Sequence, residues 1–358
     1  MKQPSILLVL SESGTGGMQA MVGNLAMGLA DRGWKVDIAA GGASPMPAVV
    51  EEAVATRQAI ALHRLPSPSG ITGLLRWTGM LRRLVAELQP DQLHGHGLRT
   101  AWPLVAAGQR PAPRILVSCH GLPREHLSRT TRLLRLSRVS VAAVGPGLAE
   151  ELQSHGIDAA CIENGVPPAP TPVERQALMI DLNLDPSTSL VVCPARLSPQ
   201  KDPLSLVRAI AHVPGASLVL VGGGPLEAAV VEEVSRLGLK DRVAITGWRD
   251  DARSILGAAD LLAMASHWEG QPLVAIEAAL AGIPIVATDC PGVGDWLVDG
   301  VDALLSPVGE PRALARNIER ALQDHEMRRQ MIDGAEALGR CHTLDAMVDA
   351  YIAAYEAG

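Results

Sequence analysis

Short apolar runs alternate with amphipathic stretches along most of the chain. In the first half, the runs have the length of buried strands, and apolar residues at helical spacing fill several of the stretches between them. The first helix is expected from Met18 to Leu29, with Gly33 just past its end. The strands predicted for this half are Ile6–Leu10, Val36–Ala40, Ala59–Leu65, Gln92–His94, Ile115–Ser118 and Val141–Val144. Strands that alternate with helices in this way predict a parallel sheet covered on both faces.

A proline-rich stretch interrupts the alternation at residues 167–172. Because proline fits neither a helix interior nor a central strand, we predict a domain linker at this point. The alternation then restarts, with strands expected at Leu190–Cys193, Leu218–Val221, Val243–Ile245, Leu261–Ala263 and Ile285–Ala287. The sequence therefore predicts an α/β protein with two consecutive Rossmann-like, doubly wound domains, 1–166 and 167–340. A final helix near Leu344–Glu356 could pack on either domain, and we assign residues from about 341 to 358 to the first.

Composition agrees with two domains and limits what their cores contain. A chain of 358 residues, 47% of them hydrophobic, is long enough and apolar enough for two cores. Only 2% of the residues are aromatic: Phe is absent, and Tyr351 and Tyr355 are the only tyrosines. Aliphatic side chains must therefore fill both cores.

The formal net charge of -7 divides unevenly between the two halves. Residues 1–170 contain 16 Lys and Arg against 12 Asp and Glu, a net charge of +4. Residues 171–358 contain 15 against 26, a net charge of -11. This difference suggests two domains that face different partners.

Cysteine usage and the first apolar run bear on the compartment. Five scattered cysteines without a CxxC pair argue against a disulfide framework or a zinc site and favour a reducing cytosol. The first apolar run is only strand length, and no apolar run is long enough to span a bilayer. We therefore expect no signal peptide and a cytoplasmic protein.

The most informative segment covers residues 266–278 and reads SHWEGQPLVAIEA. A loop ends at Gly270, Pro272 suits the first helical turn, and an apolar helix follows. The start of this helix leaves N–H groups unpaired at its positive dipole end, where phosphate oxygens bind well. Glu269 precedes the helix and Glu277 lies within it, so two carboxylates could accept hydrogen bonds from sugar hydroxyls. The spacing alone is equally consistent with two ordinary solvated or capping glutamates.

This segment resembles the E-x7-E signature of the retaining GT-B glycosyltransferases of family GT4. The likeness covers nearly the whole chain. Its other matches are Gly16-Gly17, Asn164-Gly165-Val166, Arg196 and Lys201 in a segment like G-R-x-x-x-x-K-G, Gly222-Gly223-Gly224-Pro225, and Gly247. The chain departs from the family at Asp202, where Gly is usual, and at residues 291–295 (PGVGD) in place of Gly-Gly-x-x-Glu. The resemblance implies a GT-B architecture, with the two domains facing each other across a cleft.

The resemblance also implies a role for each matching residue. Glu277 would hold the donor ribose, and Glu269 would accept hydrogen bonds from the transferred sugar. Arg196 and Lys201 would neutralise the diphosphate, and His120 would face the donor sugar. Four of these residues, His120, Arg196, Lys201 and Glu269, are the expected catalytic residues. The other donor-binding positions are Gly16, Gly17, Gly247, Trp248, Arg249, Gly270, Gln271, Pro272, Leu273 and Val274.

The charged residues favour a reaction without a metal ion. Breaking a glycosidic bond to a diphosphate builds negative charge on the leaving oxygen, and two cations beside a helix N-terminus stabilise that charge. No Asp-x-Asp triplet is present; Asp250 and Asp251 are adjacent and are expected to cap a helix. His94 and His96, two residues apart at a strand end, are poor evidence for a metal site. We therefore predict neither a metal nor another cofactor.

Two basic stretches of the first domain suggest a partner surface. The segment Leu122–Val139 carries five arginines at close to three-residue spacing, together with leucines. A second group contains Arg76, Trp77, Arg82 and Arg83. Basic amphipathic helices of this kind suit an anionic membrane, although a solvated face over a packed core gives the same pattern. We expect peripheral contact with the inner face of the membrane and no nucleic-acid partner.

The expected function is retaining, metal-independent transfer of a hexose-type sugar from a UDP- or GDP-linked donor. The expected acceptor is a glycan or a lipid-linked molecule used in cell-envelope polysaccharide or glycolipid synthesis. Two alternatives stay open at this point. One is an enzyme like UDP-N-acetylglucosamine 2-epimerase, which needs no acceptor; the other is a non-catalytic protein that binds nucleotide sugars. The set of charged residues described above favours transfer over both.

Overall fold

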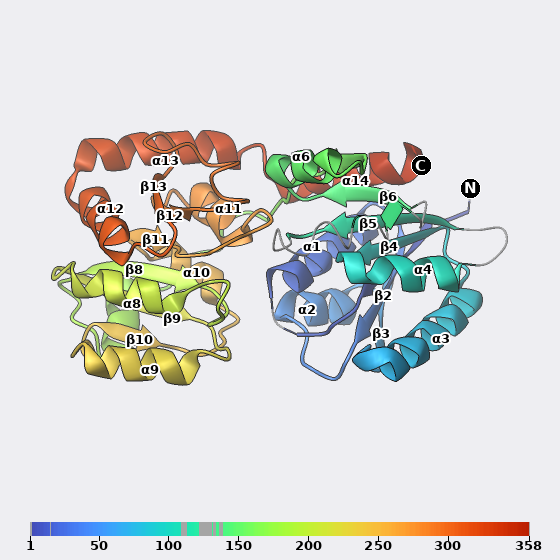
Figure 1. The fold of residues 1–358 in the computed structure, drawn as a ribbon, viewed down its shortest axis with the longest axis horizontal. Helices are drawn as coiled ribbons and strands as arrows, with labels where there is room; N and C mark the ends of the chain where they lie inside the picture. Colours follow the sequence, from blue (N-terminus) through green and yellow to red (C-terminus); the bar gives the residue numbers. More distant parts are fainter. Residues whose placement is uncertain are drawn as a thin grey trace. The chain divides into compact units, whose positions relative to one another are not determined.

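The computed structural model describes residues 2–14, 16–108, 113–121, 131, 134–135 and 139–357. The chain divides into two compact units (Figure 1). The first unit contains Met1–Pro167 together with Thr343–Gly358, and the second contains Pro168–His342. The chain thus enters the second unit at the start of the proline-rich stretch and returns to the first unit just before the last helix.

The sheet of the first unit has the strand order β3-β2-β1-β4-β5-β6-β7. Its strands are β1 (Ser5–Leu10), β2 (Lys35–Gly41), β3 (Ile60–Leu65), β4 (Gln92–His96), β5 (Arg114–Cys119), β6 (Ser140–Ala143) and β7 (Ala159–Cys161). Its helices are α1 (Gly17–Asp31), α2 (Ala48–Thr56), α3 (Gly70–Leu88), α4 (Ala101–Ala107), α6 (Pro146–Ser154) and α14 (Leu344–Ala357), with a 3-10 turn at Leu98–Thr100. Every strand pairing of this sheet among the described residues is parallel.

The direction of winding in this sheet reverses beside β1. From β1 the chain moves outward through β2 and β3, and then crosses back so that β4 pairs with the other side of β1. In open parallel sheets, ligands bind outside the carboxyl ends of the strands at such a reversal. In the first unit this position lies beyond Leu10 of β1 and His96 of β4, which are register partners.

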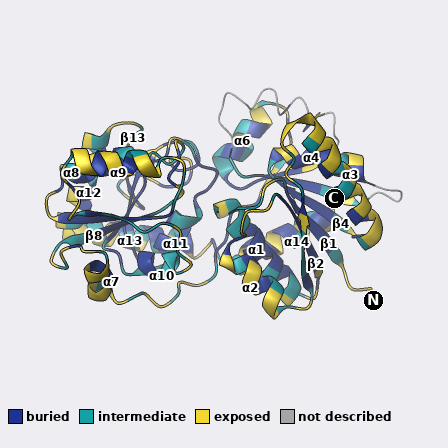
Figure 2. Cartoon of the chain, turned by 90° about the horizontal axis from the view of Figure 1, so that it is seen from below, coloured by how far each residue is buried: buried dark blue, intermediate teal, exposed yellow. Residues whose placement is uncertain are grey.

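Helices cover both faces of the first sheet, as continuous apolar parallel strands require. On one face, α3, α4 and α6 form an aliphatic core with the strands around the fully buried Trp77. Figure 2 shows α1, α2 and α14 on the opposite face. Gly28 of α1 lies so close to α14 that an added Cβ would meet the Val348 side chain at 2.4 Å. Each large aliphatic side chain buried in this way contributes about 1.5–3 kcal/mol, so the core holds without Phe.

The second unit repeats the same plan. Its strands are β8 (Ser189–Pro194), β9 (Ala216–Val221), β10 (Val243–Ile245), β11 (Leu261–Ala263), β12 (Ile285–Asp289) and β13 (Leu304–Pro307). They pair in parallel in the order β10-β9-β8-β11-β12-β13. Its helices are α7 (Arg175–Asp181), α8 (Pro203–Ala211), α9 (Glu227–Arg236), α10 (Ala252–Gly257), α11 (Leu273–Leu280), α12 (Pro311–Gln323) and α13 (His325–Gly339). Here the winding reverses between β8 and β11, and α8, α9 and α12 share one core with the sheet.

The predicted α/β class with two doubly wound parallel sheets is confirmed. Two strands of the structure, β7 and β13, lie outside the predicted set. Both are short edge strands, and two of the three residues of β7 are exposed. An edge strand needs no long apolar run, so its pattern does not separate it from a loop.

Candidate active site

Three predicted charged residues of the second unit follow the two strands at its winding reversal. Arg196 and Lys201 lie in the loop after β8, and Glu269 lies in the loop after β11. These strands are hydrogen-bonded neighbours, so their carboxyl ends open side by side. The reversal between them is where an open parallel sheet binds its ligand.

Lys201 and Glu269 form a short ion pair at the centre of this position. The Lys201 Nζ and the Glu269 Oε1 lie 2.5 Å apart. The hydroxyl of Ser266 donates to the same carboxylate oxygen at 2.6 Å. The Glu269 side chain is 6% exposed and that of Lys201 is 24% exposed, so the pair is largely shielded from water. Two donors on one oxygen leave Oε2 of Glu269 as the carboxylate oxygen without a described hydrogen bond.

Arg196 differs from Lys201 in having no partner among the described residues. Its side chain is exposed beside the loop that follows β9. That loop approaches the Arg196 segment very closely: a Cβ on Gly222 would meet the Ala195 carbonyl oxygen at 2.2 Å, and one on Gly224 would meet the Leu197 carbonyl oxygen at 2.4 Å. The glycines Gly222 and Gly224 therefore let two loops pack backbone against backbone and place Arg196.

Asp202 explains one departure from the family pattern. Its φ is +41°, in the left-handed region that favours glycine and that Asp tolerates better than most residues. Its carboxylate accepts hydrogen bonds from the Ser205 backbone N–H at 3.2 Å and the Ser205 hydroxyl at 2.6 Å. Asp202 thus takes the left-handed backbone and caps α8, directly after Lys201.

The loop that carries Glu269 is held by the segment after β12. The Glu269 N–H donates to the Pro291 carbonyl oxygen at 2.8 Å. Gly292 has φ +80°, and a Cβ at this position would lie 2.5 Å from the Glu269 carbonyl oxygen. Only glycine fits both the conformation and the space. The residues 291–295 that depart from the family pattern therefore support the Glu269 loop.

Glu277 lies on α11, eight positions after Glu269 in the sequence. The first turn of α11 contains Leu273 and Val274. Pro272 is the residue before the helix, one position earlier than the sequence suggested. Nε of Arg253, on α10, lies 3.1 Å from Oε1 of Glu277. Burial raises the pKa of Glu277 to about 7, and the Arg253 charge opposes this rise. Glu277 is therefore a carboxyl group that titrates near neutral pH.

The remaining predicted residues of the second unit have different surroundings. Trp248 is 49% exposed after Gly247, whose φ of +68° suits a tight turn. Arg249 forms two hydrogen bonds to Asp251, at 2.7 and 2.6 Å. Asp251 occupies the N-cap position of α10 but makes no side-chain cap, so the predicted capping role is wrong: its carboxylate binds Arg249.

Two more predicted residues lie in the loop before α11. Gly270 is buried next to Gly292. The Gln271 side chain is buried and its amide nitrogen lies 3.1 Å from Nε2 of His342. The same imidazole nitrogen accepts a hydrogen bond from Trp296 at 3.1 Å. Gln271 is thus bonded to the last residue of the second unit.

The first unit places Gly16 and Gly17 at the carboxyl end of β1. Gly16 is the N-cap of α1 and Gly17 its first residue. Gly16 has an extended backbone and brings no side chain to the helix start, so no side chain caps the first N–H groups of α1. A fifteen-residue helix therefore presents an open, positively polarised end beside the reversal of the first sheet.

His120 follows β5 and is the end of a histidine cluster in the first unit. Nε2 of His120 lies 3.1 Å from Nδ1 of His96. The His94 ring packs against the His96 ring, with ring centroids 4.0 Å apart and an angle of 40° between the ring planes. Burial lowers the pKa of His120 to about 4 and lowers the pKa values of His94 and His96 well below their ordinary value. All three imidazoles are therefore neutral at physiological pH.

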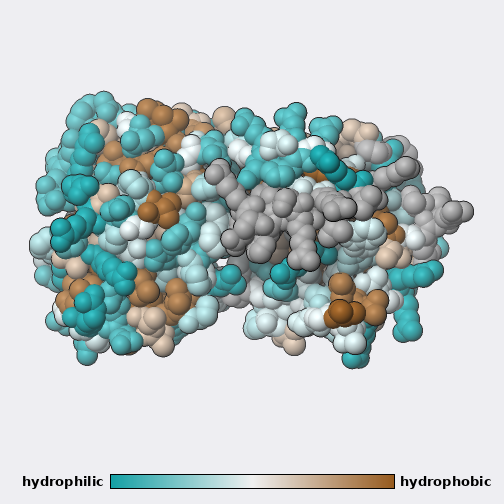
Figure 3. Space-filling model, in the orientation of Figure 1, coloured by the Kyte–Doolittle hydropathy of each residue, from teal (hydrophilic) through white to brown (hydrophobic). Residues whose placement is uncertain are grey.

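The structure describes only part of the two basic stretches that the sequence suggested as a partner surface. Most of the segment Leu122–Val139 lies outside the described residues. In the second stretch Trp77 is fully buried in the core, so it is not part of a surface. The exposed apolar residues of α3 are Ile71, Leu74 and Leu75, and Figure 3 shows a brown patch over this part of the helix. None of the described helices has the length and apolarity that crossing a bilayer requires.

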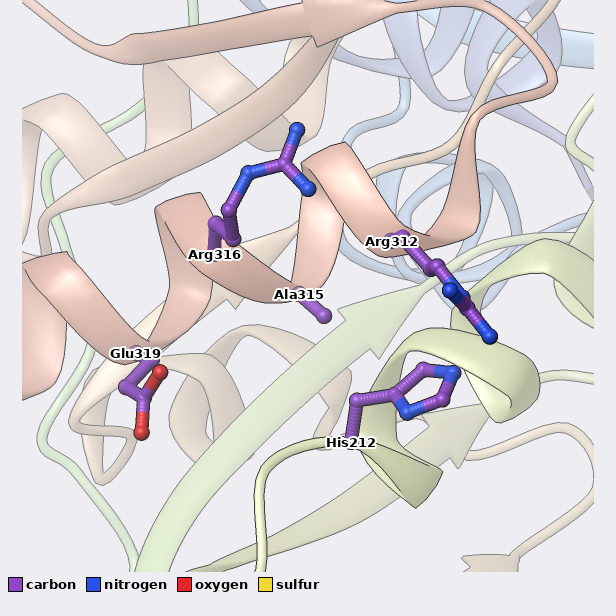
Figure 4. A pocket seen from close by; sticks show the side chains of 5 residues that line it. All are labelled: His212, Arg312, Ala315, Arg316 and Glu319. Atoms are coloured by element: carbon purple, nitrogen blue, oxygen red, sulfur yellow. The ribbon is translucent and has the colours of Figure 1, made fainter.

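A surface hollow elsewhere in the second unit contains none of the predicted residues. It lies between the end of α8 and the exposed side of α12 (Figure 4). Figure 4 shows His212 and Arg312 facing each other across it, whereas Arg316 points away from them. The side chains of His212, Arg312, Arg316 and Glu319 around it are exposed, and we assign no role to it.

Three contacts at the candidate site were beyond sequence reasoning. Arg253 meets Glu277 from a different helix, 24 positions away, and no spacing rule connects them. His96 meets His120 because β4 and β5 are neighbours, which requires the sheet order. Ser266 lies in the signature segment, three residues before Glu269, and this short spacing is the only sequence feature that could have indicated its hydrogen bond to Glu269.

Family profiles and curated relatives similar to this chain include glycosyltransferases. The family profile Glycosyltransferase Family 4 matches residues 15–169, and Glycosyl transferases group 1 matches residues 174–338. The lipopolysaccharide core biosynthesis glycosyltransferase LpsD of Rhizobium meliloti is 29% identical over 332 residues, 91% of this chain and 88% of the relative. The D-inositol 3-phosphate glycosyltransferase of Nocardia farcinica is 30% identical over 393 residues, 96% of this chain and 87% of the relative. Among solved structures, HepE of Anabaena in complex with UDP and glucose has a TM-score of 0.84 and 21% identity, covering 99% of this chain and 100% of that one.

Proposed function

The chain belongs to glycosyltransferase family 4, the retaining GT-B glycosyltransferases that use nucleotide sugars, and from this we propose that it transfers a hexose from a UDP-sugar to a lipid-linked saccharide of the cell envelope. The choice of UDP is supported by the HepE complex, which contains UDP and glucose. The choice of acceptor is supported by LpsD, which is named for lipopolysaccharide core biosynthesis.

The observation that carries the proposal is the charged group at the winding reversal of the second sheet. Lys201 and Glu269 meet there at 2.5 Å, with the exposed Arg196 in the same loop as Lys201 and the start of α11 after Glu269. Two cations and a helix N-terminus suit a diphosphate. A carboxylate with one free oxygen suits sugar hydroxyls. The arrangement therefore matches a molecule that has both parts.

In the proposed complex, each charged residue has one task. Arg196 and Lys201 bind the diphosphate together with the N–H groups of Leu273 and Val274. Oε2 of Glu269 accepts hydrogen bonds from the sugar, and Glu277 accepts them from the ribose hydroxyls. Trp248 and Arg249 lie at the nucleobase. In the first unit, His120 and the amides of Gly16 and Gly17 are the proposed donor contacts.

The proposed reaction needs only these groups. The bond between the anomeric carbon and the diphosphate oxygen breaks while the acceptor oxygen bonds to the same face of the sugar. The acceptor proton passes to the departing diphosphate oxygen, so atoms and charge balance. Arg196, Lys201 and the α11 N-terminus stabilise the negative charge on that oxygen, which is the role a metal ion fills elsewhere. We propose that the transfer proceeds without a metal ion.

The basic, apolar helix α3 of the first unit is the proposed contact with an anionic membrane surface. On α3, Ile71 is 82% exposed and Leu75 is 68% exposed, and Arg76, Arg82 and Arg83 follow on the same helix. An apolar patch beside arginines can insert at the headgroup level while the cations bind anionic lipid. This would bring the first unit to a lipid-linked acceptor at the membrane surface.

The proposal is tested by ligand binding followed by product analysis. A thermal-shift screen of UDP-, GDP-, ADP- and TDP-hexoses in EDTA should show stabilisation by a UDP-sugar. This stabilisation should be lost in Glu277→Ala and Arg196→Ala. With an acceptor extract, the anomeric proton coupling of the product should report retention. Release of UDP and an epimerised sugar without acceptor would support the epimerase alternative, and binding without turnover on any acceptor would support the non-catalytic one.

A further inference from the structure

A continuous polar cluster in the first unit connects the last helix to His120. His94 on β4 has a hydroxyl on each ring nitrogen: the Tyr355 OH lies 2.7 Å from Nδ1 and the Ser118 Oγ lies 2.8 Å from Nε2. The Tyr351 OH lies 3.0 Å from the same Ser118 oxygen. Both tyrosines of the chain therefore belong to this cluster. Because hydroxyls can donate or accept, His94 is satisfied in either neutral tautomer.

His96 is in a different position, because only one of its ring nitrogens has a partner. Its Nδ1 lies 3.1 Å from Nε2 of His120. Its Nε2 is buried and has no hydrogen-bond partner among the residues that the structure describes, and the whole side chain is 0% exposed. The His94 ring packs against it, with centroids 4.0 Å apart and the ring planes tilted by 40°, and limits the rotation of the His96 ring.

The unpaired Nε2 of His96 determines which of the two imidazoles donates the hydrogen bond between His96 and His120. A neutral imidazole carries one N–H and one acceptor nitrogen. If His96 carried its proton on Nε2, that N–H would be buried without an acceptor, which is the rarer and costlier defect. If the proton is on Nδ1, the unpaired atom is a lone pair and the Nδ1–H donates to His120. The second arrangement is the favoured one.

The proton on His96 then determines the state of His120. Nε2 of His120 accepts the hydrogen bond, so a neutral His120 must carry its own proton on Nδ1. No described residue hydrogen-bonds to that Nδ1. His120 therefore has an N–H donor on Nδ1 and no second lone pair with which to take a proton.

We propose that His96 is a positioning residue that fixes His120 as the neutral tautomer protonated on Nδ1. His120 acts as a hydrogen-bond donor to the bound sugar and not as a base. The link to sugar transfer rests on the proposed function, whereas the tautomer does not. Burial lowers the pKa values of both imidazoles, which keeps the pair neutral and the arrangement intact at physiological pH.

The tautomer is measured directly by nitrogen-15 NMR of the full chain labelled in histidine. The expected spectrum of the wild-type protein at neutral pH has His120 with a protonated Nδ1 and an unprotonated Nε2, assigned by the loss of its signals in His120→Ala. A protonated Nε2 on His120 would overturn the proposal whatever the enzyme does.

Two substitutions of His96 separate positioning from packing. His96→Asn keeps an N–H donor near the Nδ1 position, whereas His96→Leu fills the space without a hydrogen bond. The Asn variant should keep the His120 spectrum and kcat within about threefold of wild type. The Leu variant should shift the His120 signals towards a mixture of tautomers and lower kcat at least tenfold, with an unchanged Kd for UDP. His212→Asn, on the surface of the second unit, is the matched control and should leave kcat unchanged.

The remaining outcomes also decide the question. If the Asn and Leu variants lose activity equally while both remain folded in thermal melts, His96 contributes packing only and the proposal is wrong. If the Leu variant changes the His120 tautomer without changing kcat, the tautomer has no bearing on transfer and the positioning role is wrong. Failure of the wild-type chain to transfer any sugar, with the expected NMR spectrum, would instead count against the proposed function.

Discussion

The Nζ of Lys201 and the Oε1 of Glu269 lie 2.5 Å apart, although 68 positions separate the two residues in the chain. Their loops follow β8 and β11, the neighbouring strands between which the second sheet reverses its winding. Glu269 thus neutralises Lys201 and holds its ammonium group in place. The adjacent Arg196 has no such partner among the described residues, so the two proposed phosphate ligands are held differently.

Because of this difference, replacing Arg196 should lower activity strongly and change stability very little. Because the exposed guanidinium supports no described contact, Arg196→Ala should change the free energy of unfolding by no more than about 0.5 kcal/mol. The same change should lower kcat/KM about 100-fold, since it removes one stabiliser of the leaving diphosphate. Urea unfolding and steady-state kinetics measure the two effects. Arg312→Ala on α12 is the matched control; if it lowers kcat/KM as much, the effect is one of general charge.

Glu277 predicts a pH dependence of donor binding. Its pKa of about 7 means that the carboxylate, the stronger hydrogen-bond acceptor, forms as the pH rises from 6 to 8. The Kd for the UDP-sugar should therefore fall about tenfold over this range. Isothermal titration calorimetry at several pH values measures the change. Glu277→Gln should bind more weakly and with no such pH dependence; an unchanged profile in this variant would assign the titration to another group.

The raised pKa of Glu277 also predicts how the stability of the protein changes with pH. The pKa of Glu277 is raised above its ordinary value of 4.5, so the folded ligand-free protein holds a proton that the unfolded chain releases. The free energy of unfolding should fall as the pH rises from about 4.5 to about 7. Glu277→Gln should remove this part of the pH dependence.

Gly292 should be intolerant of any side chain. Gly292→Ala combines a left-handed backbone with a Cβ 2.5 Å from the Glu269 carbonyl oxygen, and should cost about 2–5 kcal/mol. Gly300 is the control, because its φ of +75° is similar and nothing lies within 4 Å of an added Cβ. Gly300→Ala should cost only about 1–2 kcal/mol. Chemical denaturation compares the two; equal costs would mean that the Glu269 loop moves freely.

The two tyrosines of α14 should differ in their contribution to stability. Tyr355→Phe removes the partner of His94 Nδ1 and leaves a buried polar atom unpaired, at a cost of about 1–3 kcal/mol. Tyr351→Phe should cost less, because the Ser118 hydroxyl keeps His94 as a partner. Urea unfolding of both variants measures the difference. A larger effect of Tyr351→Phe would contradict the hydrogen-bond pattern described for the cluster.

The apolar patch of α3 predicts membrane binding that depends on three residues. Ile71, Leu74 and Leu75 changed together to Ser should lower co-sedimentation with vesicles of anionic lipid about tenfold at low salt. Stability should hardly change, because these side chains are exposed. Val231→Ser, at an exposed position of α9, is the control. If the wild-type chain does not bind such vesicles, the proposed membrane contact is wrong.

Sequence reasoning reached the strands and helices that form the centre of each unit. Buried parallel strands such as β1 and β8 are continuous apolar runs, which is why pattern alone identified them. β7 reads Ala-Ala-Cys and is largely exposed, so it has no such pattern. Trp77 was assigned to a surface although Leu81, Leu84 and Val85 follow it at the spacing of a buried helix face, a signal that was present in the sequence.

The sequence predicted residues of the candidate site but not all of their contacts. The residues Lys201 and Glu269 came from a motif, and the structure brings them together. The contact of Arg253 with Glu277 and that of His96 with His120 depend on which elements are neighbours in space. A single sequence does not contain that information in its spacing, because strand order and helix packing decide it.

The return of α14 to the first unit makes the second unit an insertion within the first. During synthesis, all residues of the second unit leave the ribosome before Thr343–Gly358 does. The second unit can therefore complete its core while the first still lacks the helix that covers Gly28 and supplies both tyrosines to His94 and Ser118. The unit that is made first is finished last, because the tyrosine hydroxyls that bind His94 and Ser118 arrive only with α14.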